Sequence, residues 1–64
     1  MRITAFRTRL ADEFGPSLAD TIAHDHVFSA LGDRTVDQAL DAGLSTKEIW
    51  QAVCEAFEVP VERR

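Results

Sequence analysis

Glycine residues divide this chain of 64 residues into short segments, because they stand at positions 15, 32 and 43. Between them, apolar side chains recur every three or four residues, which is the spacing of one face of an α-helix. No stretch alternates between apolar and polar residues for long enough to predict a β-strand. The sequence therefore predicts an all-α fold: a compact bundle of three to four short helices, forming a single domain over residues 1–64.

The first half of the chain predicts two helices, over about residues 3–14 and 17–31. The first carries one apolar stripe, formed by Ile3, Phe6, Leu10 and Phe14. The second carries a broad apolar face, formed by Leu18, Ile22, Ala23, Val27 and Ala30. Gly15 and Pro16 separate the two helices, because glycine favours the end of a helix and proline favours the first turn of the next.

The second half predicts helices over about residues 36–42 and 46–58, followed by a frayed tail at 60–64. Each helix begins with a capping box, in which a hydroxyl group and a side chain three residues later satisfy each other's backbone N–H groups. The two boxes are Thr35 with Gln38 and Ser45 with Glu48. The fourth helix is expected to bury Ile49, Val53, Ala56 and Phe57.

A short turn that contains glycine joins these last two helices, and the order Ala39, Gly43, Ile49 resembles that of a helix-turn-helix unit. Gln38 departs from the pattern, since such units usually place an apolar residue there. In a DNA-binding protein of this kind, the fourth helix would enter the major groove by its first turns. It offers one cation, Lys47, and no arginine for guanine. We expect a helix-turn-helix-like corner, and nucleic-acid binding is the alternative function.

Composition excludes several classes of protein. The longest uninterrupted apolar run has three residues, so we expect no membrane span, no signal peptide and a cytoplasmic location. The one cysteine, Cys54, cannot form an internal disulfide or a redox pair. The net charge of −4 disfavours a general binder of polyanions, because phosphate contacts need clustered lysine and arginine.

No residue set points to catalysis or to a cofactor. His24 and His26 are two positions apart, and on a helix such ligands point about 200° apart, so they do not readily share a metal ion. A dyad of Cys54 and His26 is conceivable, but Cys54 stands at the edge of an apolar face, where a thiol behaves as a small hydrophobe. A chain this short also has little room for a substrate pocket. We expect no enzymatic activity, no metal and no cofactor.

His26 stands within the apolar face predicted for the second helix, which favours a buried ring that is hydrogen-bonded. Asp25 is its neighbour, and either Arg7 or Arg34 could pair with this carboxylate. Arg7 could instead extend its charged end to solvent. We therefore expect His26, Asp25 and Arg34 to form a structural polar core.

Trp50 stands at the margin of the buried face of the fourth helix. Half-exposed tryptophans are frequent interface anchors, although Trp50 could also simply close a small core. It forms a candidate interaction surface with Lys47, Gln51, Arg2 and Arg9. The predicted function is that of a small non-enzymatic module that binds an unidentified protein partner. A purely structural or homo-oligomeric role is a third possibility, since the oligomeric state does not follow from the sequence.

Several short motifs occur along the chain, each of them once. They are Glu13-Phe14-Gly15, Asp25-His26-Val27, Ala42-Gly43 and Ile49-Trp50-x-Ala52-Val53-Cys54. In combination they resemble a family of very short actinobacterial proteins, domain of unknown function 3046, over essentially the whole chain. The resemblance implies no activity, cofactor or binding residue. It does imply a genomic context near the recombinase RecA and its regulator RecX, and so a link to DNA repair by association.

Overall fold

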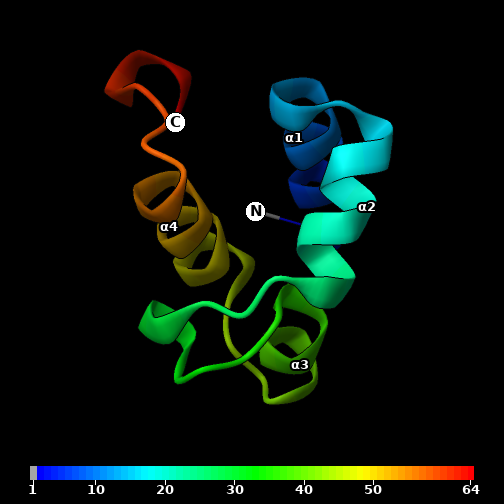
Figure 1. Ribbon diagram of the computed structural model, residues 1–64, viewed down its shortest axis with the longest axis vertical. Coiled ribbons are helices and arrows are strands. Elements are labelled where there is room, and N and C mark those ends of the chain that lie inside the picture. The colour runs from blue at the N-terminus through cyan, green and yellow to red at the C-terminus, as the bar shows by residue number, and fades with distance from the viewer. Residues whose placement is uncertain (1) are drawn as a thin grey trace.

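The computed structural model describes residues 2–64, and within them four α-helices and two short 3-10 helices form a compact bundle. The elements are α1 (Ile3–Phe14), α2 (Pro16–Asp25), η1 (Ser29–Leu31), α3 (Val36–Asp41), α4 (Thr46–Ala56) and η2 (Val61–Arg63). Figure 1 shows α4 facing α1 and α2, with α3 at one end of the bundle. The predicted all-α fold is confirmed: one isolated bridge, between Phe28 and Arg34, is the extent of β pairing in residues 2–64.

Gly15 joins α1 to α2 without an intervening loop. Its backbone angles, φ 85° and ψ 151°, lie in a region that residues with a side chain rarely adopt. Its N–H group donates to the carbonyl of Ala11 at 2.8 Å, and its own carbonyl accepts from Ala19 at 2.9 Å. The same glycine therefore closes α1 and opens α2, and Pro16 occupies the first turn of α2, where a missing N–H costs nothing.

α2 ends at Asp25 and does not continue to residue 31, so the predicted second helix is too long. His26 adopts an extended conformation, and the N–H of Phe28 donates to the carbonyl of Arg34 at 3.0 Å. A continuous helix would place Phe28 on the face opposite Ile22 and Ala23, toward solvent. In the structure Phe28 is buried, so the helix gives way to an extended segment that turns this ring into the core.

The predicted polar core is wrong for the same reason. Once α2 ends, Asp25, His26 and Arg34 are all exposed. The His26 ring packs beside Phe28, with 4.5 Å between the ring centroids, but the residue as a whole is exposed. Arg34 turns its guanidinium group to the carbonyl of Leu31, at 3.3 Å, instead of to a carboxylate.

α3 and α4 begin where their capping residues predict. Thr35 accepts from the N–H of Gln38, and the Gln38 side chain accepts from the N–H of Thr35, which completes the first box. Gln38 is exposed, because its amide serves this cap. Ser45 accepts from the N–H of Glu48 at 3.1 Å. Ala39 and Ile49 are fully buried on either side of the turn, so the two helices approach closely there.

The core lies between all four α-helices, and the extended segment after α2 adds to it. Its largest fully buried side chains are Phe6, Ile49, Val36, Val53 and Cys54. Ile3, Leu18, Val27 and Ala30 of the predicted apolar faces lie outside this core and are exposed. Two residues expected in it from the fourth helix also lie outside: Ala56 is exposed and Phe57 is 37% exposed. They stand at the end of α4, where the helix stops and Val59 takes the buried position instead.

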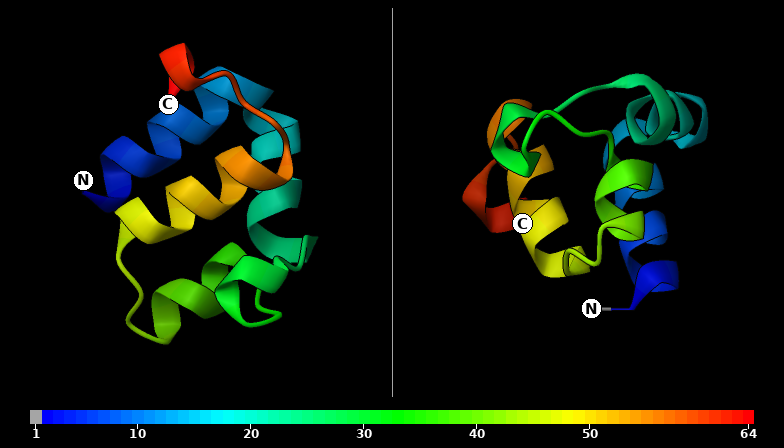
Figure 2. Two further views of the ribbon diagram at one scale, coloured as in Figure 1. Left: turned by 90° about the vertical axis from the view of Figure 1, so that its left-hand side faces the viewer. Right: turned by 90° about the horizontal axis from the view of Figure 1, so that it is seen from below.

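The last residues lie against the bundle, in the region where the sequence predicts a frayed tail. Residues 61–63 form η2, which lies beside the end of α1 (Figure 2, left). Arg63 forms an ion pair with Glu13 at 3.0 Å, and Arg64 donates to the carbonyl of Val59 at 2.8 Å. Charged side chains thus hold a segment that has little apolar surface.

Among residues 2–64, no helix combines the length and apolar character needed to cross a bilayer.

Candidate interaction surfaces

Trp50 is a core residue, which corrects its predicted role as a half-exposed anchor. It is only 4% exposed, and its ring meets Phe6 edge-on with 6.3 Å between the centroids. Its Nε1–H donates to the backbone carbonyl of Arg64 at 3.2 Å. The tail thus covers the side of the indole that the helix periodicity leaves at the margin of the core. Arg9, Glu13 and Trp50 thus form a surface that the tail covers, named here the tail cleft. Beside the docked tail a space of about 330 Å³ remains open, lined by Arg9, Asp12, Glu13, Trp50 and Arg63.

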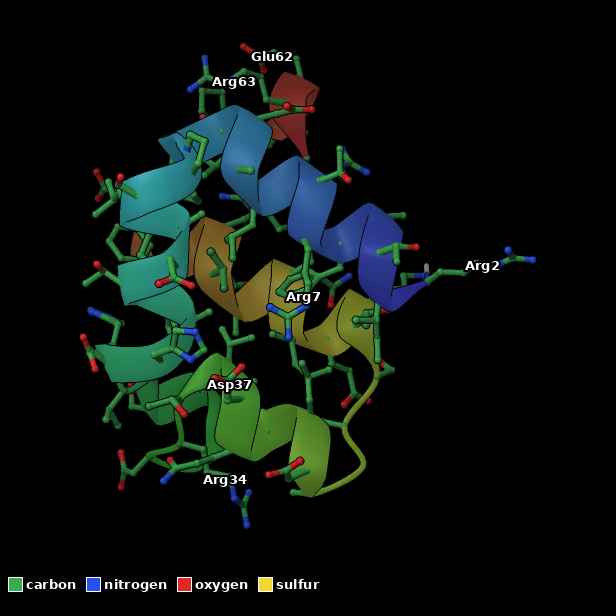
Figure 3. The ribbon with its side chains drawn as sticks, turned by 90° about the vertical axis from the view of Figure 1, so that its right-hand side faces the viewer. Arg2, Arg7, Arg34, Asp37, Glu62 and Arg63 are labelled. Carbon is green, nitrogen blue, oxygen red and sulfur yellow. The ribbon has the colours of Figure 1, made fainter. Side chains whose placement is uncertain are left out.

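The other residues of the predicted surface do not form one patch. Arg9 lies over the Trp50 ring, 5.3 Å from its centroid, whereas Arg2 precedes α1 and extends away from the bundle (Figure 3). Lys47 and Gln51 are exposed on α4, and at four-residue spacing they share a stripe with Glu55. Of the predicted surface residues, the structure therefore places Arg9 against Trp50. Arg2 lies apart from them, and Lys47 and Gln51 belong to the exposed stripe of α4.

Glu55, the last residue of that stripe, lines an open groove that the sequence did not predict. The groove has a volume of about 300 Å³ and lies between the extended segment after α2 and the last turns of α4. We call it the connector groove; it is lined by His26, Val27, Phe28, Ser29, Ala30, Ala52, Glu55 and Ala56. Val27 is 52% exposed at its edge. The predicted helix over residues 17–31 would place Val27 and Ala30 in the core. Because α2 ends at Asp25, both side chains line this groove instead.

Aromatic rings support one wall of the connector groove. The His26 ring lies 5.1 Å from that of Phe57, and Phe57 in turn contacts Phe14 edge-on at 5.3 Å. Phe28 lies beneath His26 and is buried. The wall therefore rests on rings from α1, from the extended segment and from the end of α4, which pack against one another.

A second cluster of polar groups joins three helices on another face. His24 of α2 contacts Asp37 of α3 through Nδ1 and Asp20 through Nε2, the latter at 3.0 Å. Arg7 of α1 points toward Asp37 and lies 3.9 Å from it (Figure 3). The hydrogen bond to Asp37 and the negative charge of Asp37 raise the pKa of His24, and Asp20 adds to this effect. Both ring nitrogens donate only in the imidazolium form, so the cluster favours a charged His24.

Cys54 and His26, the two residues considered as a dyad, lie in different environments. Cys54 is fully buried, and desolvation raises the pKa of its thiol, so the sulfur stays protonated at neutral pH. His26 is exposed beside Phe57, on the surface. Within residues 2–64, no group of three or more histidine, cysteine, aspartate or glutamate side chains is placed to hold a metal ion.

These features define a small all-α protein with a packed core, a groove of mixed polar and apolar lining, and a tail folded back on its first helix. The chain belongs to the family described as "Protein of unknown function (DUF3046)", whose model matches residues 1–62. The family resemblance inferred from the sequence is therefore confirmed. No curated protein and no solved structure matches the chain.

Proposed function

We propose that this protein is a non-enzymatic interaction module that binds a basic, amphipathic segment of a partner protein in the connector groove. The observation that carries this proposal is the groove itself, a concavity in which apolar side chains, with the half-exposed Val27 at the edge, alternate with the polar His26, Ser29 and Glu55. Its volume of about 300 Å³ stands at the lower end of the range of small-molecule pockets. A space of this size suits one or two apolar anchor side chains of a partner.

Charge favours a basic occupant. Glu55 lines the connector groove. Asp25 directly precedes His26, which also lines it, and Glu58 directly follows Phe57, whose ring packs against His26. Among residues 2–64, these three carboxylates have no cationic partner within 4.0 Å. A partner with lysine or arginine beside its apolar anchors would meet complementary charge, which raises the association rate and selects against acidic segments.

A helical mode of binding fits the shape. An amphipathic helix presents apolar side chains at positions i, i+3, i+4 and i+7 to a groove, while its polar face stays in water. The groove is bounded along one side by α4, whose exposed Gln51 and Glu55 are one turn apart. A second helix lying along α4 would place its anchors against Val27 and Ala56 and its cations near Glu55.

An NMR titration of the full chain tests this function. The probe is a designed amphipathic peptide with leucines on one face and lysines on the other, and the control peptide has glutamates in place of the lysines. We expect saturable shifts confined to residues 26–30 and 52–58 with the lysine peptide. Val27→Ser should weaken binding roughly fivefold to tenfold, because it removes apolar contact worth about 1 kcal/mol or more. The matched control is Val61→Ser, at a valine that is 78% exposed and does not line the groove.

Two results would overturn the proposal. One is an absence of saturable binding by the lysine peptide. The other is an equal loss of affinity in Val27→Ser and Val61→Ser, because the groove would then make no special contribution. Glu55→Gln separates the two parts of the argument: it should reduce the preference for the lysine peptide over the glutamate peptide and leave the fold unchanged. Glu48→Gln, at an exposed carboxylate of the same helix, serves as its control.

Nucleic-acid binding through α4 has less support. The exposed side of this helix carries Lys47, but Glu48 and Glu55 stand beside it, and phosphates would lie near these carboxylates. Duplex DNA in the same titration should therefore give no saturable complex at low salt. A complex that weakens steeply with salt and with Lys47→Ala would favour the nucleic-acid alternative instead.

A further inference from the structure

The tail places one carbonyl oxygen between two hydrogen-bond donors of the bundle. The main-chain oxygen of Arg64 accepts from the Nε1–H of Trp50 at 3.2 Å and from the guanidinium group of Arg9 at 2.7 Å. The donors come from α4 and α1, which are rigid elements, and they converge on the same point. Such an arrangement is a ready-made receptor for a peptide carbonyl or a carboxylate oxygen.

Both donors are held in place by the core and not by the tail alone. The indole of Trp50 is 4% exposed and is fixed edge-on by Phe6. The guanidinium group of Arg9 lies over the indole ring, 5.3 Å from its centroid, where a cation–π interaction orients it. If the tail left, the indole would stay packed against Phe6, and its buried Nε1–H would need a new acceptor.

A third group of the tail cleft recognises a cation. The guanidinium Nε of Arg63 donates to both carboxylate oxygens of Glu13 at 3.1 Å, and its Nη2 lies 3.0 Å from Oε2. Glu13 is partly buried, whereas the Arg63 side chain is 58% exposed. The cleft therefore binds two adjacent groups of a peptide. Glu13 binds an arginine side chain, and Trp50 and Arg9 bind the main-chain oxygen of the residue that follows this arginine.

The occupant is held loosely. All residues of the segment 61–64 are exposed, so little apolar surface is buried when it docks. Its attachment rests on hydrogen bonds and on an ion pair that water screens. Segments of this kind open at low free-energy cost, in contrast to the core that supports the cleft.

The geometry points to a second binding site: the tail cleft takes an arginine-containing segment of a partner protein, and residues 61–64 of this chain occupy it until they are displaced. The tail acts as an internal ligand whose chemistry shows what the site accepts. A partner supplies an arginine to Glu13 and a backbone carbonyl to Trp50 and Arg9. This site is separate from the connector groove and does not depend on its function.

Trp50 fluorescence tests this site, because the chain has one tryptophan and no tyrosine. In the full-length variant Arg63→Ala, the tail loses its ion pair while Glu13, Trp50 and Arg9 remain. We expect acrylamide to quench Trp50 more strongly than in the wild type. Arg2→Ala, at an exposed arginine that extends away from the bundle, should leave quenching unchanged. Circular dichroism shows whether each variant is folded, and Glu13→Gln opens the tail from the other side of the pair.

The probe is a synthetic peptide with the sequence of residues 59–64, blocked at both ends. Added to Arg63→Ala, it should reverse the extra quenching with a saturable dependence on concentration. The same peptide with alanine at the position of Arg63 should bind roughly fivefold more weakly, the effect of one exposed ion pair. Unchanged quenching in both Arg63→Ala and Glu13→Gln would overturn the proposal. Extra quenching that the peptide does not reverse would also overturn it. The tail would then shield Trp50 from solvent without showing that the site binds a separate peptide.

Discussion

Phe6 of α1 meets Trp50 of α4 edge-on, with 6.3 Å between the ring centroids and an interplanar angle of 82°. Phe6 is fully buried, and this pair links the first helix of the chain to the last. Edge-to-face pairs add about 0.5–1.5 kcal/mol to the contribution of burial. In a chain of 64 residues, that is a substantial part of the total stability.

Replacing Phe6 should therefore reduce stability more than replacing a phenylalanine at the surface. We expect Phe6→Leu to lower the free energy of unfolding by about 2 kcal/mol, from the lost ring pair and imperfect refilling of its volume. Phe57→Leu, at a ring that is 37% exposed, should cost less than half as much. Urea denaturation followed by Trp50 fluorescence measures both. Equal losses would contradict the position of Phe6 at the centre of the core.

The pH dependence of stability should follow His24. Its pKa is raised from 6.5 by Asp37 and Asp20, so its charged form is favoured in the folded state. This contribution is fully present below about pH 6.5, while both carboxylates are ionised, and it is lost as the pH rises through the raised pKa. The difference in unfolding free energy between the wild type and His24→Gln should thus be larger at pH 6 than at pH 9.

An NMR titration of the His24 ring checks the cause. Asp37→Asn should lower the pKa of His24 toward its ordinary value, because it removes the nearest negative charge. Asp41→Asn, at an exposed carboxylate of the same helix, should leave that pKa unchanged. If the two variants give the same pKa for His24, Asp37 is not the group that raises it.

The cap of α3 should make a measurable contribution. Thr35→Ala removes the hydroxyl that accepts from Gln38, and we expect a loss of about 1 kcal/mol. In a domain of this size, such a loss lowers Tm by roughly 4–8 °C. Thr21→Ala is the matched control, since Thr21 is exposed within α2 and alanine is the better helix former. Thermal denaturation that moves Tm equally in both variants would argue against the cap.

The thiol of Cys54 should be protected in the native state. It is fully buried and its pKa is raised by desolvation, so a disulfide reagent should react with it only when the chain unfolds. The variant Thr8→Cys adds an exposed thiol on α1. At pH 8 it should show one fast and one slow reaction, which merge into a single fast phase in urea. Rapid labelling of Cys54 in the folded wild type would contradict its burial.

Much of the candidate site lay beyond the reach of sequence patterns. The interaction surface predicted around Trp50 combined residues that the structure separates, because helix periodicity does not show which segment covers the margin of a face. Residues 61–64 do so here, eleven or more positions after Trp50. The connector groove was missed for a related reason: the apolar spacing of Val27 and Ala30 is compatible with a helix, and only the burial of Phe28 rules that helix out.

What the sequence determined by itself is local. Glycine at 15, the Thr35–Gln38 box and the Ser45 cap set helix boundaries through interactions within four residues, and the structure reproduces them. The tertiary structure decided where α2 ends and what covers Trp50. Both depend on contacts between residues far apart in the chain, such as Arg63 with Glu13, whose free energy exists only once the helices have packed.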